Sequence, residues 1–165
     1  RLSRDIAKVS SYKGFFPFSI RNFALIKQAH KGGAQGLTLP YSYNDNATNL
    51  PEEYITKSGV TDYSTSNAKI AFKTAGNYII FQTATAPTFI SFNTCQNGTK
   101  GTSVLTLSAS ADGVTYTTVQ TYTINQGQNK HATKSATLSN SSYRYLKIEL
   151  TTKGDNIGVG NISIE

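Results

Sequence analysis

The chain has 165 residues, enough for one domain with its own core, because domains commonly hold about 100–200 residues. Charged residues make up only 15% and aromatic residues 11%, a mixture that excludes a coiled coil, a helical bundle and a disordered tail. The net charge of +7 comes from basic residues scattered along the chain, which indicates a solvated basic surface and no nucleic-acid site; attraction to an acidic polymer is the alternative.

The first 67 residues are less regular than the rest. Residues 1–9 fit a short helix, and residues 15–26 are apolar enough for two short strands. Residues 40–54 show no periodicity and predict a long loop, and loops of that length in compact domains are usually functional or disordered. Because no repeat, linker or shift in composition divides the chain, we expect residues 1–165 to form a single domain.

From residue 68 onward the sequence has the two-residue period of β-strands. Strands are predicted over 68–73, 77–83, 88–92, 103–108, 114–124, 143–150 and 157–164. Asp112-Gly113 is the strongest hairpin signal in the chain. Short strands at this spacing, separated by turn residues, predict an all-β fold, an antiparallel β-sandwich of the jelly-roll type.

The strand predicted over 143–150 illustrates the pattern. One face carries the apolar residues Leu146, Ile148 and Leu150. The other face carries Tyr145, Lys147 and Glu149, the last two as a plausible surface pair. This alternation is typical of a half-buried strand in an antiparallel sheet. No apolar run approaches the roughly 18 residues needed to span a bilayer, so no membrane-spanning segment is expected.

Three stretches of the C-terminal half carry a family resemblance. Ser108–Val119 resembles the hairpin of galactose-binding-like jelly rolls, Ser142–Ile148 their "Arg-Tyr-apolar-basic-apolar" strand, and Gly154–Ile164 their closing strand. These folds are the discoidin or coagulation-factor C-type domains and their carbohydrate-binding relatives, and the combination is similar to modules of secreted Bacteroidetes proteins. The chain departs from the family in having Tyr116 where a Trp is common, and in lacking a terminal cysteine pair.

The resemblance implies roles for particular residues. It places Arg144 on the core side of its strand, where pairing with a hairpin carboxylate such as Asp112 is expected over ligand contact. Asp112 itself is expected first to form the turn. Related jelly rolls often hold a structural Ca²⁺ near the chain ends, so the oxygens of residues 44–46 or of Glu165 are possible ligands, although six to eight are needed. No cofactor is otherwise expected.

Catalytic and transition-metal motifs are absent from the sequence. His30 and His131 stand alone, and no metal-ligand spacing surrounds them. Cys95, the single cysteine, follows an apolar strand and is expected to be a buried structural thiol. We therefore predict a protein that is not an enzyme. The alternative is a small jelly-roll polysaccharide lyase, for which the candidate groups are Tyr145, Lys147, His131 and Arg144.

A carbohydrate site needs aromatic rings for stacking and polar side chains for hydroxyl groups, both held on a rigid scaffold. The residues predicted to bind lie in or beside the long loop: Tyr41, Tyr43, Asn44, Asp45, Asn46 and Tyr54. The tyrosines can equally pack down to pin the loop, and the sequence leaves both roles open. The outward face Tyr145, Lys147 and Glu149 is a second candidate, which applies if its sheet is the concave one.

The composition also indicates where the protein works. Low charge, many Ser, Thr and Asn residues, no Trp and no Met fit an exported bacterial protein, and a chain that starts at Arg1 is expected to be processed. The predicted function is a non-catalytic binding module, extracellular, periplasmic or at the cell surface, with a glycan as ligand. The alternative is an interaction or accessory domain that binds a surface protein; the oligomeric state is not predicted.

Overall fold

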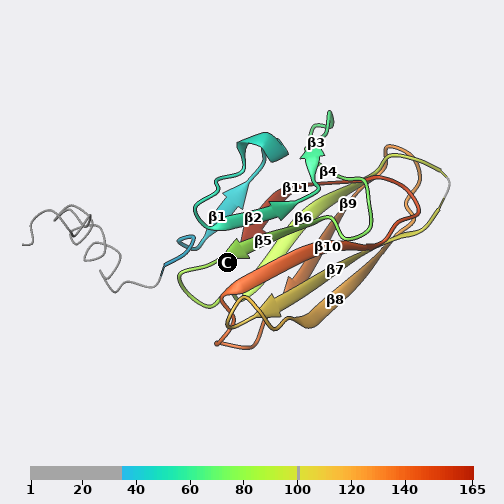
Figure 1. The fold of residues 1–165 in the computed structure, drawn as a ribbon. Helices are drawn as coiled ribbons and strands as arrows, with labels where there is room; N and C mark the ends of the chain where they lie inside the picture. Colours follow the sequence, from blue (N-terminus) through green and yellow to red (C-terminus); the bar gives the residue numbers. More distant parts are fainter. Residues whose placement is uncertain (1–34, 100) are drawn as a thin grey trace, which may run out of the picture. The chain divides into compact units, whose positions relative to one another are not determined.

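The computed structural model describes residues 35–99 and 101–165 (Figure 1). The helix and strands expected within residues 1–26, and His30, lie outside the described residues. The described elements in chain order are β1 (Tyr41–Tyr43), the 3-10 helix η1 (Ala47–Asn49), β2 (Ile55–Ser58), β3 (Thr61–Asp62), β4 (Ile70–Phe72), β5 (Tyr78–Gln82), β6 (Phe89–Gln96), β7 (Ser103–Ser110), β8 (Thr117–Ile124), β9 (His131–Thr137), β10 (Tyr145–Thr152) and β11 (Ile157–Ile164). Within this part of the chain, no helix has the length and hydropathy of a membrane span.

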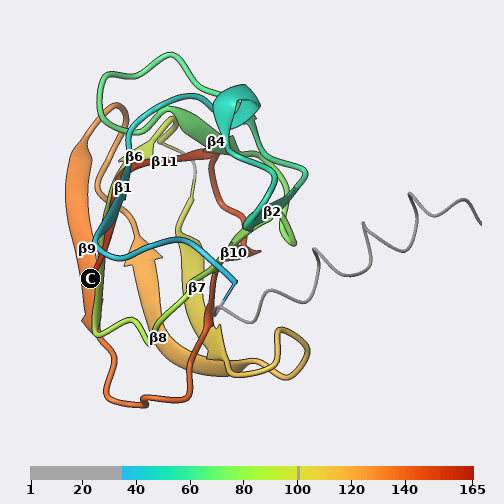
Figure 2. The same ribbon diagram turned by 90° about the vertical axis from the view of Figure 1, so that its left-hand side faces the viewer.

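The strands form two stacked antiparallel sheets. The β11 sheet has the order β3-β4-β11-β6-β9, with β1 also paired to β11, and the β10 sheet has the order β2-β5-β10-β7-β8. Figure 2 shows the layers from the side, with β1 and β9 in one and β2 and β10 in the other. From β5 to β11 every connection except the β7–β8 hairpin crosses between the sheets. The predicted all-β jelly-roll sandwich is confirmed.

The core lies between the two sheets and follows the predicted alternation. Its largest fully buried side chains include Phe72, Phe81 and Phe92. In β10, Leu146, Ile148 and Leu150 are fully buried, whereas Tyr145, Lys147 and Glu149 are partly exposed on the opposite face. Burial of an apolar side chain of this size contributes about 1.5–3 kcal/mol, so the alternating pattern fixes which face of each strand points inward.

The structure differs from the sequence expectation in four places. Strands β2 and β3 lie within residues 55–62, where the sequence predicts no strand, because four and two residues are too few to show a period. The segment 40–54, expected to be one long loop, contains β1 and η1; β1 is only three residues long and shows no readable period, but it completes the edge of β11. Strand β9 was not expected, because its alternate positions are only alanine and lysine. Strand β8 starts at Thr117, since the turn extends through residues 111–116 and leaves Val114 82% exposed.

The β3–β4 connection lies over the outer face of β11. A Cβ atom at Gly158 would lie 2.5 Å from Cδ1 of Tyr63 and 2.7 Å from the carbonyl oxygen of Ala68, so only glycine leaves room for this connection. Cys95, the cross-strand partner of Gly158, is fully buried and is the expected structural thiol; burial raises its pKa.

Substituting Gly158 by alanine tests this close approach. Because the added methyl group meets backbone as well as the Tyr63 ring, Gly158→Ala should lower the free energy of unfolding by about 1–3 kcal/mol. Ser42→Thr, which adds one methyl group at an exposed position of β1 in the same sheet, should change it by less than about 0.5 kcal/mol. Urea unfolding followed by circular dichroism measures both; equal effects would contradict the packing described for Gly158.

Candidate functional site

The predicted loop tyrosines lie on or next to the inner side of the sandwich. Tyr41 and Tyr43 in β1 are directly opposite Ile164 and Ile162 of β11, which are buried. Because directly paired residues of neighbouring strands point to the same face, the two tyrosines share the inward face of that sheet edge. Both are half-buried and pack against the core.

Each of these two tyrosines has a structural contact. The ring of Tyr41 packs on Phe81 of the opposite sheet, with 6.4 Å between ring centroids. The hydroxyl of Tyr43 donates to the carbonyl oxygen of Asn46 at 2.6 Å, and burial, followed by the charge of Asp45, raises the pKa of Tyr43 to about 12. Pinning of the loop, one of the two roles left open, is therefore visible in the geometry; stacking on a ligand remains a prediction.

The polar members of the predicted set are held by hydrogen bonds within the loop and to neighbouring strands. The carboxylate of Asp45 accepts hydrogen bonds from the backbone N–H of Asn46 at 2.7 Å and from the side chain of Asn49 at 2.9 Å, and these lower its pKa. The carbonyl oxygen of Asn44 accepts from Nζ of Lys69 at 3.1 Å. Tyr54 lies beside the other sheet, where its carbonyl oxygen accepts from the N–H of Gln82.

The predicted calcium ligands are not brought together. Within residues 35–99 and 101–165, no group of three or more His, Cys, Asp or Glu side chains is placed to hold a metal ion. Both carboxylate oxygens of Asp45 already accept hydrogen bonds. The carbonyl oxygen of Glu165 accepts from the N–H groups of Thr88 and Phe89. These groups do not fit a calcium site, and no role is derived from one.

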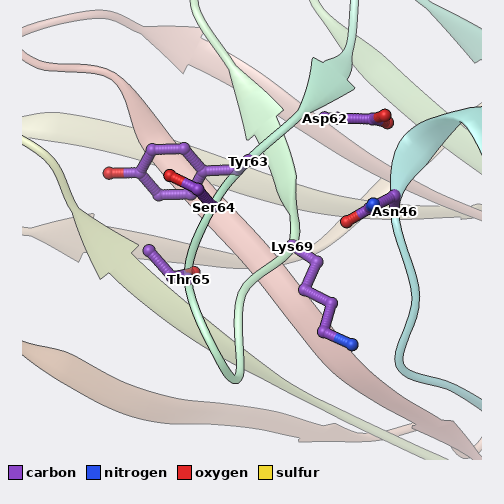
Figure 3. A pocket seen from close by; sticks show the side chains of 6 residues that line it. All are labelled: Asn46, Asp62, Tyr63, Ser64, Thr65 and Lys69. Carbon is purple, nitrogen blue, oxygen red and sulfur yellow. The ribbon is translucent and has the colours of Figure 1, made fainter.

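A polar cleft of about 460 Å³ opens beside the loop (Figure 3). It is lined by Asn46, Asp62, Tyr63, Ser64, Thr65 and Lys69. The carboxylate of Asp62 accepts from the N–H and hydroxyl of Thr48 at 2.8–3.0 Å. The ring of Tyr63 points away from Asn46 and Lys69, toward the surface of β11 that it covers. The cleft therefore offers hydrogen-bonding groups without an open aromatic ring.

The outer face of the β10 sheet presents the best arrangement for recognition. Five side chains gather there and are called the tyrosine face: Tyr78, Tyr116, Tyr145, Lys147 and Glu149. Tyr78 in β5 pairs directly with Glu149 in β10, so both point outward beside each other. The second sequence candidate, Tyr145, Lys147 and Glu149, lies within this face.

A charged pair sits at the centre of the tyrosine face. Nζ of Lys147 lies 2.5 Å from a carboxylate oxygen of Glu149, confirming the expected surface pair, and the two side chains are 22% and 28% exposed. The same Nζ lies 4.9 Å from the ring centroid of Tyr78 and 5.7 Å from that of Tyr116. Cation–π contacts of this kind contribute about 0.5–1 kcal/mol each at exposed sites, so the charge pair and rings form one ordered cluster.

The β7–β8 loop carries Tyr116 over this face. The loop projects beyond the β10 sheet on the side away from the other layer (Figure 2). Gly113 lies against Tyr145, since a Cβ atom there would be 3.0 Å from Cζ of that ring. The hydroxyl of Tyr116 is buried without a hydrogen-bond partner among the described residues, and burial raises its pKa.

Asp112 holds the loop in shape, as expected of a turn former. Its Oδ1 accepts from the hydroxyl of Ser110 at 2.8 Å and from the N–H groups of Val114 and Thr115 at 2.8 and 2.9 Å. The expected Arg144–Asp112 pair is wrong. The guanidinium of Arg144 donates instead to the carbonyl oxygens of Ser141 and Tyr143, because it lies just before β10 and turns back on its own loop.

Sequence reasoning missed Tyr78 and Tyr116 as members of the site. Their separation in the chain from Tyr145 gives no local motif; the register of β5 with β10 places Tyr78, and the β7–β8 loop places Tyr116. The lyase groups, in contrast, do not converge. Tyr145 and Lys147 lie on the outer face of the β10 sheet, whereas His131 is in β9 of the other sheet and Arg144 is engaged in its own loop.

The three hydrogen bonds to Asp112 predict a pH dependence of stability. They lower its pKa from 3.8 to about 2, with the N–H groups of Thr115 and Val114 as the largest causes. Because the pKa of Asp112 is lower in the folded protein than in the unfolded chain, its ionised carboxylate stabilises the fold at pH values above 3.8. This stabilisation is lost as the pH falls from 3.8 to about 2.

Asp112→Asn isolates this contribution. At neutral pH the variant should have a lower melting temperature than the unsubstituted protein. The difference between the two melting temperatures should disappear as the pH falls from 3.8 to about 2. Thermal unfolding by circular dichroism at a series of pH values measures it. A difference in melting temperature that does not change with pH would contradict the role of the carboxylate charge, because altered hydrogen-bond geometry alone would then explain it.

Comparisons with known proteins agree on the fold. No family model and no curated protein matches the sequence. Among solved structures, the K3 cleaved adhesin domain of Lys-gingipain from Porphyromonas gingivalis w83 is similar with a TM-score of 0.56 and 13% identity, covering 81% of this chain and 98% of that one. A single-residue variant of a family 29 carbohydrate-binding module is similar with a TM-score of 0.54 and 12% identity, covering 76% of this chain and 90% of that one.

A third similar structure is the CBM36-1 domain of a multidomain xylanase from the hindgut metagenome of Trinervitermes trinervoides. Its TM-score is 0.51 at 12% identity, covering 67% of this chain and 90% of that one. Likeness at these identities concerns the fold alone. It confirms the architecture expected from the resemblance to galactose-binding-like jelly rolls.

Proposed function

We propose that the chain is a non-catalytic binding module whose ligand is a carbohydrate and whose binding surface is the tyrosine face. The observation that carries this proposal is the Lys147–Glu149 pair with the rings of Tyr78 and Tyr116 beside its ammonium group, on the face of β10 that also presents Tyr145. A tyrosine ring offers a flat apolar surface together with a polar tip, which suits the mixed surface of a sugar ring.

The scaffold favours this role because it holds the side chains rigidly. β10 lies between β5 and β7, so its backbone is hydrogen-bonded along both edges. Beside the tyrosine face, Thr106 and Ser108 project outward from β7 opposite Glu149 and Lys147. Their hydroxyl groups can donate to and accept from sugar hydroxyls. A platform already ordered in the free protein limits the entropy lost on binding.

The comparisons support the same class of function. Two of the similar structures are carbohydrate-binding modules by name, and one of these belongs to a xylanase. The adhesin domain supports a place outside the cytoplasm, so the parent protein is proposed to be exported, with this module extracellular, periplasmic or at the cell surface. Because the side chains considered for a lyase lie apart on different sheets and loops, the module is proposed to bind without turnover.

The loop residues Tyr41, Tyr43, Asn44, Asp45, Asn46 and Tyr54 form the second proposed surface. Asn46 lines the polar cleft of Figure 3 together with Asp62 and Lys69. This region supplies hydrogen bonds to sugar hydroxyls, while Tyr41 and Tyr43 mainly stabilise the sheet edge. The two surfaces share no residue, and Tyr41 and Tyr43 pair with β11 whereas Tyr78 pairs with β10, so substitutions can separate them.

Alanine substitutions on the two surfaces distinguish them. In affinity gels containing xylan, galactomannan or hydroxyethylcellulose, Tyr78→Ala and Tyr145→Ala should weaken retention, with dissociation constants raised roughly two- to tenfold each, as expected for one lost aromatic contact. Ser135→Ala, at an exposed position of β9 in the other sheet, should bind normally.

Tyr43→Phe is the matched control for the loop, since it removes only the hydroxyl that donates to Asn46. It should leave retention unchanged. Loss of retention in Tyr43→Phe or Asn46→Ala, with Tyr145→Ala unaffected, would move the site to the loop.

Protein recognition is the second candidate function, and the likeness to an adhesin domain favours it. If the ligand is a protein, no polysaccharide in the affinity gel should slow the migration of the chain. Tyr145→Ala should then weaken the binding of a surface protein.

A further inference from the structure

Strand β8 is an edge strand without the charges that usually protect such edges. It is the last strand of the β10 sheet in the described part of the chain, and it pairs only with β7. An edge strand presents unpaired backbone N–H and C=O groups, and natural proteins commonly guard them with charged residues, above all Lys. Three of the other described edges carry a charge, namely Lys57 in β2, Asp62 in β3 and Lys134 in β9, and the remaining edge strand, β1, is only three residues long.

The sequence around β8 has no charge at all. From Val114 to Asn129 there is no Asp, Glu, Lys, Arg or His. β8 itself has the sequence TTVQTYTI, which is rich in β-branched and aromatic residues and has no proline. A bulge at Val119 interrupts the pairing with β7, and the ladder from Gln120 to Ile124 is regular. The unguarded edge is therefore at least five residues long.

We propose that this edge binds the β8 edge of a second copy of the chain, antiparallel and about a twofold axis. Residues 35–165 hold nine Lys and Arg residues against eight Asp and Glu residues, so two sandwiches meet with little net repulsion, and the uncharged edge is where they approach at the lowest electrostatic cost. Thr121 and Thr123 are exposed on β8, and threonine pairs across antiparallel strands are favourable. The product is a continuous sheet with five strands from each copy.

This geometry has a functional consequence that rests on the proposed carbohydrate-binding function. A twofold axis between antiparallel edge strands is perpendicular to the sheet, so the outer faces of both copies lie on the same side. The two tyrosine faces would then face one polymer chain together. Two sites acting on one polymer raise the apparent affinity without any new contact within a site.

Sedimentation velocity of the full chain from about 1 µM to about 1 mM tests the pairing. The protein should form a dimer, and the double substitution Thr121→Lys with Thr123→Lys should raise the dimer dissociation constant at least about tenfold. The matched control is Ser135→Lys with Thr137→Lys, which adds the same charge at exposed positions of the β9 edge. It should still form the dimer, and circular dichroism verifies that both variants fold.

A monomer at every concentration overturns the proposal, as does a dimer that the β9 control disrupts equally. Crosslinking gives a second measurement, because Cys95 is fully buried and leaves the surface free of thiols in the described residues. Single cysteines placed in turn at positions 120–124 should crosslink best at one position and less on either side, because a disulfide requires Cβ atoms about 3.5–4.5 Å apart across the axis. Uniform or absent crosslinking in a dimer contradicts pairing through β8. Neither readout depends on a glycan.

Discussion

Strand β10 is bound by one constraint that organises both sides of its sheet: successive side chains must point to opposite faces. Burial of Leu146, Ile148 and Leu150 between the sheets fixes the register, and the same register sends Tyr145, Lys147 and Glu149 outward. A slip of one residue would bury the Lys147–Glu149 pair without water and expose three leucine or isoleucine side chains. The packing of the core therefore also determines which side chains of β10 lie on the outer surface.

The same constraint explains what could be predicted from the sequence. Alternation of apolar residues predicts β5, β7, β10 and β11 closely, although in β11 the alternation is interrupted by a register shift between Gly160 and Ser163. The sequence does not predict β9, because its inward positions carry Ala132, Lys134 and Ala136, which give no hydrophobic alternation. It is a strand only through its pairing with β6. The three residues of β1 are too short for any period, and only their pairing with the end of β11 makes them a strand.

The candidate site was half predictable for a related reason. Tyr145, Lys147 and Glu149 lie on one strand, so their common face follows from the sequence. Tyr78 and Tyr116 join them through strand order and through a loop whose shape depends on Asp112, and neither is encoded by local spacing. The loop tyrosines show the opposite case: proximity in sequence placed Tyr41 and Tyr43 together, but the pairing with β11 turned them inward.

The covered surface of β11 gives the two sides of the sandwich different freedom to change. At Gly158 and Gly160 even one methyl group collides with the backbone of residues 67–69 or with Tyr63, so that side tolerates little variation. At the tyrosine face the covering β7–β8 loop meets the side chain of Tyr145 at Gly113 and no strand backbone, and the face projects from a sheet whose stability is supplied from beneath. Mutation can therefore remodel one side of the molecule while the other conserves the architecture, which is how a single scaffold acquires new specificities over evolutionary time.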